Sequence, residues 1–294
     1  MFRPLEKYAD IASVAASGTG TADIPVSGTY YGLALVCLDG GSAVSVANIK
    51  DNLTNVKLTL DGTTVYEANA NAIYDLASHY YGQYGYTQTA GILPINLAPT
   101  YFNNARAAEA LAWGMGGINS FQVELSFSAN VGTATHTDQI QVYVQRSPVT
   151  RPLGEHYRLA TYTRNYASSG DQEVTELPIA GGADVVTTAW HWQYDGSSAV
   201  INSLEAIVNN QTVRNYGTPL VAQQAAFEAR RQWLVAGAAN DLFSVSFNES
   251  NDPAGNLPHR GLNDLRFKIN WSAAPNSHKI IRESFHGIGR SNSY

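Results

Sequence analysis

The residues that could do chemistry are few in this chain, and they do not gather in the sequence. The single cysteine, Cys37, lies in the apolar run LALVCLDG, which is typical of a buried thiol. Two carboxylates, Asp39 and Asp195, begin nearly identical strings, DGGSAV and DGSSAV. Paired carboxylates could serve as acid and base in glycoside hydrolysis. Each precedes a glycine, however, and an Asp-Gly pair is explained by a turn alone, so we favour turn formation.

The histidines are scattered and form no close pair. His136 and His278 lie at equivalent places in two similar segments, which favours one ancestral turn residue over catalysis. The chain has no Gly-x-Ser-x-Gly elbow, phosphate loop or His-Glu-x-x-His motif. We therefore assign no catalytic and no cofactor-binding residue. The seven histidines are His79, His136, His156, His191, His259, His278 and His286.

An aromatic segment, TAWHWQY, could bind a sugar or fill a core. Alternation places Trp190, Trp192 and Tyr194 on one face of a strand, with His191 and Gln193 on the other. The functional interpretation is a platform for carbohydrate. We favour the aromatic core face of a central strand, because buried aromatic side chains dominate sandwich cores.

The loop NESNDPAGN concentrates oxygen ligands at Asn248, Glu249, Asn251 and Asp252. The spacing does not match the helix–loop calcium motif, so a polar loop is favoured over a metal site. Metal ligands therefore stay unassigned.

The amino-acid composition narrows the class of protein. The chain has 294 residues, of which 44% are hydrophobic and only 14% charged, with 17 Tyr and 25 Gly. Such a chain is typical of an all-β protein with many turns and an uncharged polar surface. The net charge is −6, which does not suit binding to a phosphate backbone. No stretch approaches the ~20 apolar residues of a membrane span, and no secretory signal is recognised at the N-terminus.

The chain contains similar segments twice. GINSFQVELSFSA at 117–129 aligns without gaps with GLNDLRFKINWSA at 261–273, and every large apolar position agrees. Alternation predicts a half-buried strand in each, entered through a Gly-apolar-Asn turn. Other correspondences follow in the same order. They are the two DG strings, strands over 55–60 and 206–213, helices over 65–81 and 220–237, and last strands over 135–145 and 277–285.

This internal duplication predicts an all-β fold of two tandem jelly-roll β-sandwiches, each with a flanking short helix. An N-terminal helical leader is also predicted, with Leu5, Tyr8, Ile11 and Val14 on one stripe. Two prolines and a glycine within QRSPVTRPLGEH predict a linker. The predicted domains are a leader at 1–28, a first jelly roll at 29–148, a linker at 149–156 and a second jelly roll at 157–294.

With its leader, its duplicated DG(G/S)SAV and Gly-x-Asn segments and its paired helices, the chain resembles the major capsid proteins of tailless icosahedral bacteriophages with an internal membrane. The closest likeness is to the corticovirus-like double jelly-roll coat proteins. In that family three copies form a pseudo-hexagonal capsomer, and the coat packs over a lipid bilayer.

The resemblance implies a structural protein of the virion, made in the host cytoplasm and without enzymatic activity. Its implied partners are two further copies in a homotrimer, neighbouring capsid trimers, and vertex and membrane proteins of the virion. Contact of the leader with lipid, no direct contact with nucleic acid, no required cofactor and structural calcium without assignable ligands are also implied.

Two other functions stay open at this point. A tandem β-sandwich that binds or acts on carbohydrate is favoured by the aromatic strand. The absence of a secretory signal and of disulfides weighs against it. A phage spike or another minor structural protein is the third alternative.

Overall fold

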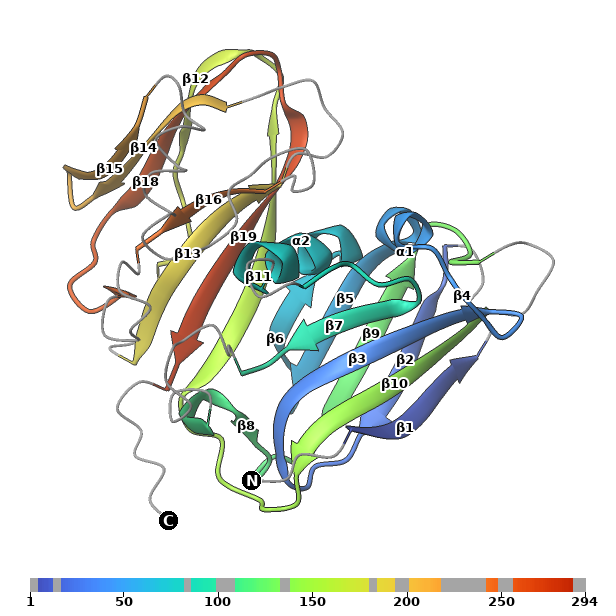
Figure 1. Ribbon diagram of the computed structural model, residues 1–294. Coiled ribbons are helices and arrows are strands. Elements are labelled where there is room, and N and C mark those ends of the chain that lie inside the picture. Colours follow the sequence, from blue (N-terminus) through green and yellow to red (C-terminus); the bar gives the residue numbers. More distant parts are fainter. Residues whose placement is uncertain are drawn as a thin grey trace. The chain divides into compact units, whose positions relative to one another are not determined.

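The computed structural model describes residues 5–12, 17–81, 86–98, 109–132, 138–179, 184–193, 201–217, 242–247 and 256–287. The chain forms two compact units and passes from the first to the second between residues 160 and 161, while residues 79–85 count with the second. Figure 1 shows both units as layered β-sheets.

The first unit is built from β1 (Leu5–Ala12), β2 (Thr19–Ile24), β3 (Thr29–Asp39), β4 (Ser42–Ala43), α1 (Val46–Asn52), β5 (Leu53–Leu60), β6 (Thr63–Ala68), α2 (Ala70–Tyr81), β7 (Ile92–Asn96), β8 (Trp113–Gly114), β9 (Phe121–Phe127) and β10 (Asp138–Ser147). The second is built from β11 (His156–Tyr166), β12 (Gly170–Val174), β13 (Val185–Gln193), β14 (Ile201–Val208), β15 (Gln211–Tyr216), β16 (Leu242–Ser246), β17 (Leu257–Pro258), β18 (Leu265–Trp271) and β19 (Asn276–His286).

Strand pairing is the same in both units. In the first, β1, β10, β3 and β7 pair in that order in one sheet, and β2, β9, β5 and β6 in the other. In the second, β11, β19, β13 and β16 form one sheet, and β12, β18, β14 and β15 the other. Two facing antiparallel sheets with this exchange of strands between them form a jelly roll. Two tandem jelly rolls are thereby confirmed.

The two jelly rolls also share their irregularities. The β5–β9 register slips at Thr54, and the β14–β18 register slips at Asn202. The β5–β6 ladder slips at Val65, and the β14–β15 ladder slips at Val213. A bulge re-aims a strand at one defined place, so two bulges at equivalent places point to one ancestral sandwich.

One side chain in each jelly roll ties the Gly-apolar-Asn turn to a hairpin. The Oδ1 atom of Asp61, in the β5–β6 turn, accepts hydrogen bonds from the backbone N–H groups of Asn119 and Ser120, both at 2.8 Å. Oδ1 of Asn209, in the β14–β15 turn, accepts from Asn263 at 2.8 Å and Asp264 at 3.2 Å. Asp61 and Asn209 have φ values of 46° and 47°, a conformation that Asp and Asn tolerate better than most residues. The two similar sequence segments therefore make the same anchoring interaction in both jelly rolls.

This interaction gives a first prediction. Asp61→Ala removes the acceptor and places alanine at positive φ, so we expect the free energy of unfolding to fall by about 1–2 kcal/mol. Asp61→Asn keeps both the acceptor and the tolerated backbone conformation, so it should cost less than about 0.5 kcal/mol. Urea unfolding followed by circular dichroism measures both values. Equal losses for the two variants would show that the bonds contribute nothing.

Each jelly roll closes over aromatic side chains. In the first, Tyr30 meets Phe121 edge to face with ring centroids 5.4 Å apart, and both side chains are buried. In the second, Trp190 and Trp192 are fully buried, and the Trp192 ring lies 4.7 Å from Phe267. The predicted core role of these tryptophans is confirmed.

The predicted N-terminal helix is wrong. Residues Leu5–Ala12 form β1, which pairs with β10 from Leu5 opposite Gln145 to Ala12 opposite Gln139. The three-residue spacing of Leu5, Tyr8 and Ile11 suggested a helix, but a bulge at Tyr8 restores alternation in a strand. The long pairing with β10 outweighs a weak local pattern.

Other sequence predictions are confirmed in part. The helix expected over 65–81 covers only Ala70–Tyr81, because β6 continues to Ala68. The strand expected over 206–213 is a hairpin that turns at Asn209 and Asn210. The string at 195–200 and the helix over 220–237 lie outside the described residues. In the described part, no helix is long and apolar enough to cross a membrane.

Candidate functional site

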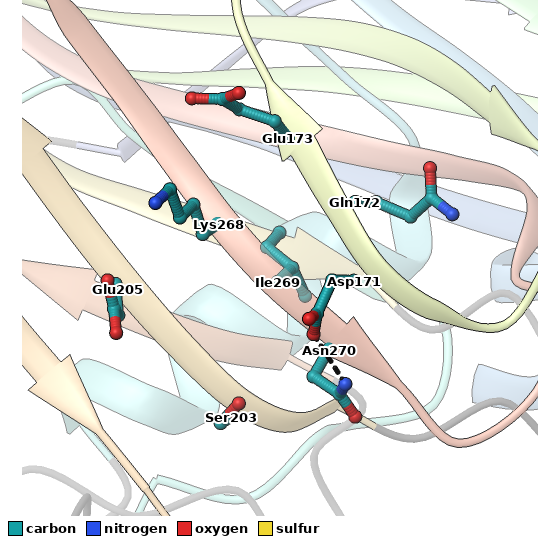
Figure 2. A pocket seen from close by; sticks show the side chains of 8 residues that line it. All are labelled: Asp171, Gln172, Glu173, Ser203, Glu205, Lys268, Ile269 and Asn270. Atoms are coloured by element: carbon teal, nitrogen blue, oxygen red, sulfur yellow. Dashed lines mark hydrogen bonds between the residues drawn. The ribbon is translucent and has the colours of Figure 1, made fainter.

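A polar hollow lies on the outer face of the second jelly roll. Its volume is about 480 Å³, and it is lined from β12, β14 and β18 by Asp171, Gln172, Glu173, Ser203, Glu205, Lys268, Ile269 and Asn270. Alternation along β18 explains its polar lining residues, because Phe267 and Trp271 point into the core whereas Lys268 and Asn270 point out. In Figure 2, Lys268 stands between the side chains of Glu173 and Glu205.

Hydrogen bonds and ion pairs order this face. Asn270 Nδ2 donates to Asp171 Oδ1 at 2.6 Å, and Arg266 Nε lies 3.4 Å from Glu173 Oε1. The lining offers carboxylates, an ammonium, two amides and a hydroxyl, but no thiol or imidazole. Such a surface suits recognition of a polar, mixed-charge partner rather than nucleophilic chemistry.

A metal does not fit the residues that the structure describes. Among them, no group of three or more His, Cys, Asp or Glu side chains could hold an ion. In the hollow, the Lys268 ammonium stands between carboxylates and takes the place that a cation would need. Four candidate calcium ligands, Asn248, Glu249, Asn251 and Asp252, lie outside the described residues.

A second polar group is buried in the second unit. The Tyr80 hydroxyl donates to the Glu283 carboxylate, which lies 3.4 Å from His191 Nε2. His191 Nδ1 lies 2.7 Å from Ser244 Oγ. The four side chains are almost completely buried, so no substrate reaches them. A buried polar network of this kind favours one packing of the strands.

The remaining sequence candidates take structural roles or lie outside the described part. Cys37 is buried and free of any disulfide. Asp39 ends β3 opposite Ser42, in the predicted turn. The ring of His278 stacks on Tyr166 at 5.4 Å. Asp195, Tyr194 and His136 lie outside the described residues.

The buried tryptophans remove the observation that favoured carbohydrate binding. Trp190 and Trp192 are fully buried in the core of the second jelly roll. A sugar platform must present its aromatic face to solvent.

Sequence reasoning missed the two residues that hold the repeat together. Asn209 lies inside the strand predicted over 206–213, whereas Asp61 follows the strand predicted over 55–60 and begins a DG pair, which is a turn signal. That signal predicts a turn, but it does not reveal that the side chain reaches a segment more than fifty residues away.

We expect the free energy of unfolding to depend on pH through His259. Its side chain is buried, with Nε2 2.8 Å from Thr187 Oγ1. Burial and the neighbouring Arg282 guanidinium lower the pKa of His259 from 6.5 to about 4. The unfolded chain then takes up this proton at a higher pH than the folded chain. The contribution of His259 is fully present above pH 6.5 and is lost as the pH falls toward 4.

We therefore expect the free energy of unfolding to fall by about 2 kcal/mol between pH 6.5 and about pH 4.5 because of this residue. Urea unfolding at both pH values tests the expectation. The His259→Gln variant should show a correspondingly smaller fall, and an unchanged fall would assign the acid sensitivity to other groups.

Comparison with known proteins identifies the fold of the whole chain and a matching family for its first jelly roll. The major capsid protein P2 of bacteriophage PM2 superimposes with a TM-score of 0.78 at 15% identity, over 99% of this chain and 100% of that chain. The STIV major capsid protein gives 0.67 at 11% identity, over 97% of each chain. The PBCV-1 virus capsid protein gives 0.60 at 10% identity, over 100% of this chain and 96% of that one. No curated protein matches the chain.

Two tandem jelly rolls of this topology define a double jelly-roll protein. Residues 5–146, which form the first jelly roll, match the family model described as the viral coat protein P2 N-terminal domain. The family match covers the first jelly roll, and the whole chain shares the fold of the double jelly-roll capsid proteins named above.

Proposed function

We propose that the chain is the major capsid subunit and that it assembles as pseudo-hexameric trimers into an icosahedral shell over an internal membrane. The observation that carries the proposal is the duplication itself. Strand order, two bulges and one turn anchor recur in both units. Three copies of such a chain present six similar domains around one axis, which suits hexagonal tiling.

The surface composition supports broad contacts between subunits. Only 14% of residues are charged, and Tyr, Asn, Ser and Thr take their place. Interfaces of this kind are polar at the rim and wet, and they favour Tyr over Lys and Glu. The proposed partners are the other two copies of the trimer, neighbouring trimers, and vertex and membrane proteins.

Other parts of the proposal concern chemistry. We infer no enzymatic activity and no direct contact with nucleic acid, in keeping with the net charge of −6. Contact of the N-terminal segment with lipid belongs to the proposal, now through a strand that exposes Leu5 and Tyr8. Structural calcium stays a proposal without assigned ligands.

Light scattering on the purified chain tests the assembly unit. We expect a mass of three times 31.7 kDa that is stable to dilution. A monodisperse monomer at every concentration would count against the capsid function.

A further inference from the structure

Two equivalent sheets carry the same charge pair on their outer faces with the signs exchanged. In the first jelly roll, Lys57 on β5 is the cross-strand partner of Glu124 on β9, with Nζ 3.6 Å from Oε2. In the second, Glu205 on β14 is the cross-strand partner of Lys268 on β18. The shared registers and bulges make Lys57 equivalent to Glu205, and Glu124 equivalent to Lys268.

The outer strands of the two sheets extend this contrast. At the same level, Thr21 on β2 and Glu67 on β6 flank the pair of the first sheet. Glu173 on β12 and Asn215 on β15 flank the pair of the second. Across the four strands in equivalent order, the first sheet is neutral, negative, positive and negative. The second is negative, positive, negative and neutral.

We propose that the outer face of the β2-β9-β5-β6 sheet of one copy docks on the outer face of the β12-β18-β14-β15 sheet of a second copy, with equivalent strands opposite each other. The inference rests on the proposed function, because it names a contact between capsid subunits. In this arrangement Glu124 faces Lys268 of the second copy, and Lys57 faces Glu205 of the second copy. The hollow of about 480 Å³ beside Glu205 and Lys268 gives the incoming side chains room (Figure 2).

The charge pattern disfavours two competing arrangements. Two first sheets with equivalent strands opposite each other bring Glu124, Lys57 and Glu67 each against its own copy, which makes three like-charged pairs. If a first sheet meets a second sheet in a crossed arrangement, with β9 opposite β14, carboxylate faces carboxylate and ammonium faces ammonium. Like-charge contacts across an interface are strongly unfavourable, so they suppress wrong pairings.

Two competitors keep their charges balanced. If two first sheets met in a crossed arrangement, Lys57 of each would face Glu124 of the other. If two second sheets met in this way, Lys268 of each would face Glu205 of the other. Exchanging the two residues within the sheet leaves either of these contacts balanced. The same exchange turns the proposed contact into two like-charged pairs. A paired exchange therefore separates the proposed arrangement from both competitors.

The test uses three full-length variants. The first exchanges one pair, Lys57→Glu with Glu124→Lys. The second exchanges the other pair, Glu205→Lys with Lys268→Glu, and the third carries all four substitutions. Each variant keeps the composition, the net charge and the opposite signs of the exchanged pair, while it places a new carboxylate beside Glu67, beside Glu173 or beside both on the exposed face. Circular dichroism should therefore show the wild-type fold. Association is measured by analytical ultracentrifugation at low and at high salt.

We expect each pair-exchanged chain to lose at least about tenfold in association constant, because two attractive contacts become repulsive. The chain with all four substitutions should return to within about threefold of the wild type, since complementarity is restored. The wild-type Lys57 and Glu124 side chains are 29% and 33% exposed, so high salt should reduce these differences.

The outcomes separate this contact from the proposed function. Unchanged association of the pair-exchanged chains overturns the contact and leaves the capsid function standing. Loss in the pair-exchanged chains without recovery in the chain with four substitutions also overturns it. A wild-type chain that never associates overturns the proposed function and the contact together.

Discussion

Replacing Trp192 by alanine is expected to lower the free energy of unfolding of the second jelly roll by about 4 kcal/mol. The indole is fully buried, 4.7 Å from the Phe267 ring and 6.4 Å from the Phe243 ring. Two facing sheets cannot collapse around so large a void, so both transfer energy and packing energy are lost. Chemical denaturation followed by far-ultraviolet circular dichroism measures the change.

Trp192→Phe is the matched control for this variant. It keeps an aromatic ring against Phe267 and leaves a smaller cavity, so we expect about half the loss. A loss below about 1 kcal/mol for Trp192→Ala would show that the side chain is not a core residue. It would also reopen carbohydrate binding, which requires an accessible ring.

Removing the cation from the ion pair between α1 and α2 is the second large effect. Lys50 Nζ lies 2.9 Å from Asp75 Oδ1, and the Asp75 side chain is 1% exposed whereas Lys50 is 20% exposed. Lys50→Met leaves the carboxylate buried without this cation. We expect the free energy of unfolding of the first jelly roll to fall by about 3 kcal/mol, measured by urea unfolding.

The double variant Lys50→Met with Asp75→Asn isolates the charge. Removing both charges avoids a buried carboxylate that has lost its cation, so most of the lost stability should return. If the double variant is no more stable than Lys50→Met alone, the loss comes from packing of the lysine stem on Tyr74, 5.9 Å from the ammonium.

The sequence predicted those parts of the fold that depend on alternation. The strands around Phe121 and Leu265 superimpose in topology, because both follow a Gly-apolar-Asn turn and alternate without interruption. The placement of Trp190 and Trp192 toward a core follows from the same period of two. The fold class and the duplication therefore follow from the residue pattern alone.

Other features depend on partners that are distant in sequence. The sequence predicts a helix at the leader because the spacing of Leu5, Tyr8 and Ile11 fits one, and nothing local reveals β10 as its partner. The anchoring role of Asp61 and Asn209 depends on segments that fold back from more than fifty residues away.

The exchange of charge signs between the two sheets also could not be predicted from the sequence. Lys57 and Glu205 become comparable only when both ladders and their bulges are known. One residue of slippage would move these side chains to the core face. The strand register therefore determines that these charged side chains lie together on one outer face.

Electron microscopy of particles assembled from the purified chain, or of virions that contain it, tests the central claim most directly. The account predicts a closed shell of pseudo-hexagonal capsomers, each made of three chains and showing six upright jelly rolls around its axis. A map in which each capsomer contains six chains, or in which the chain forms only isolated spikes, would contradict it.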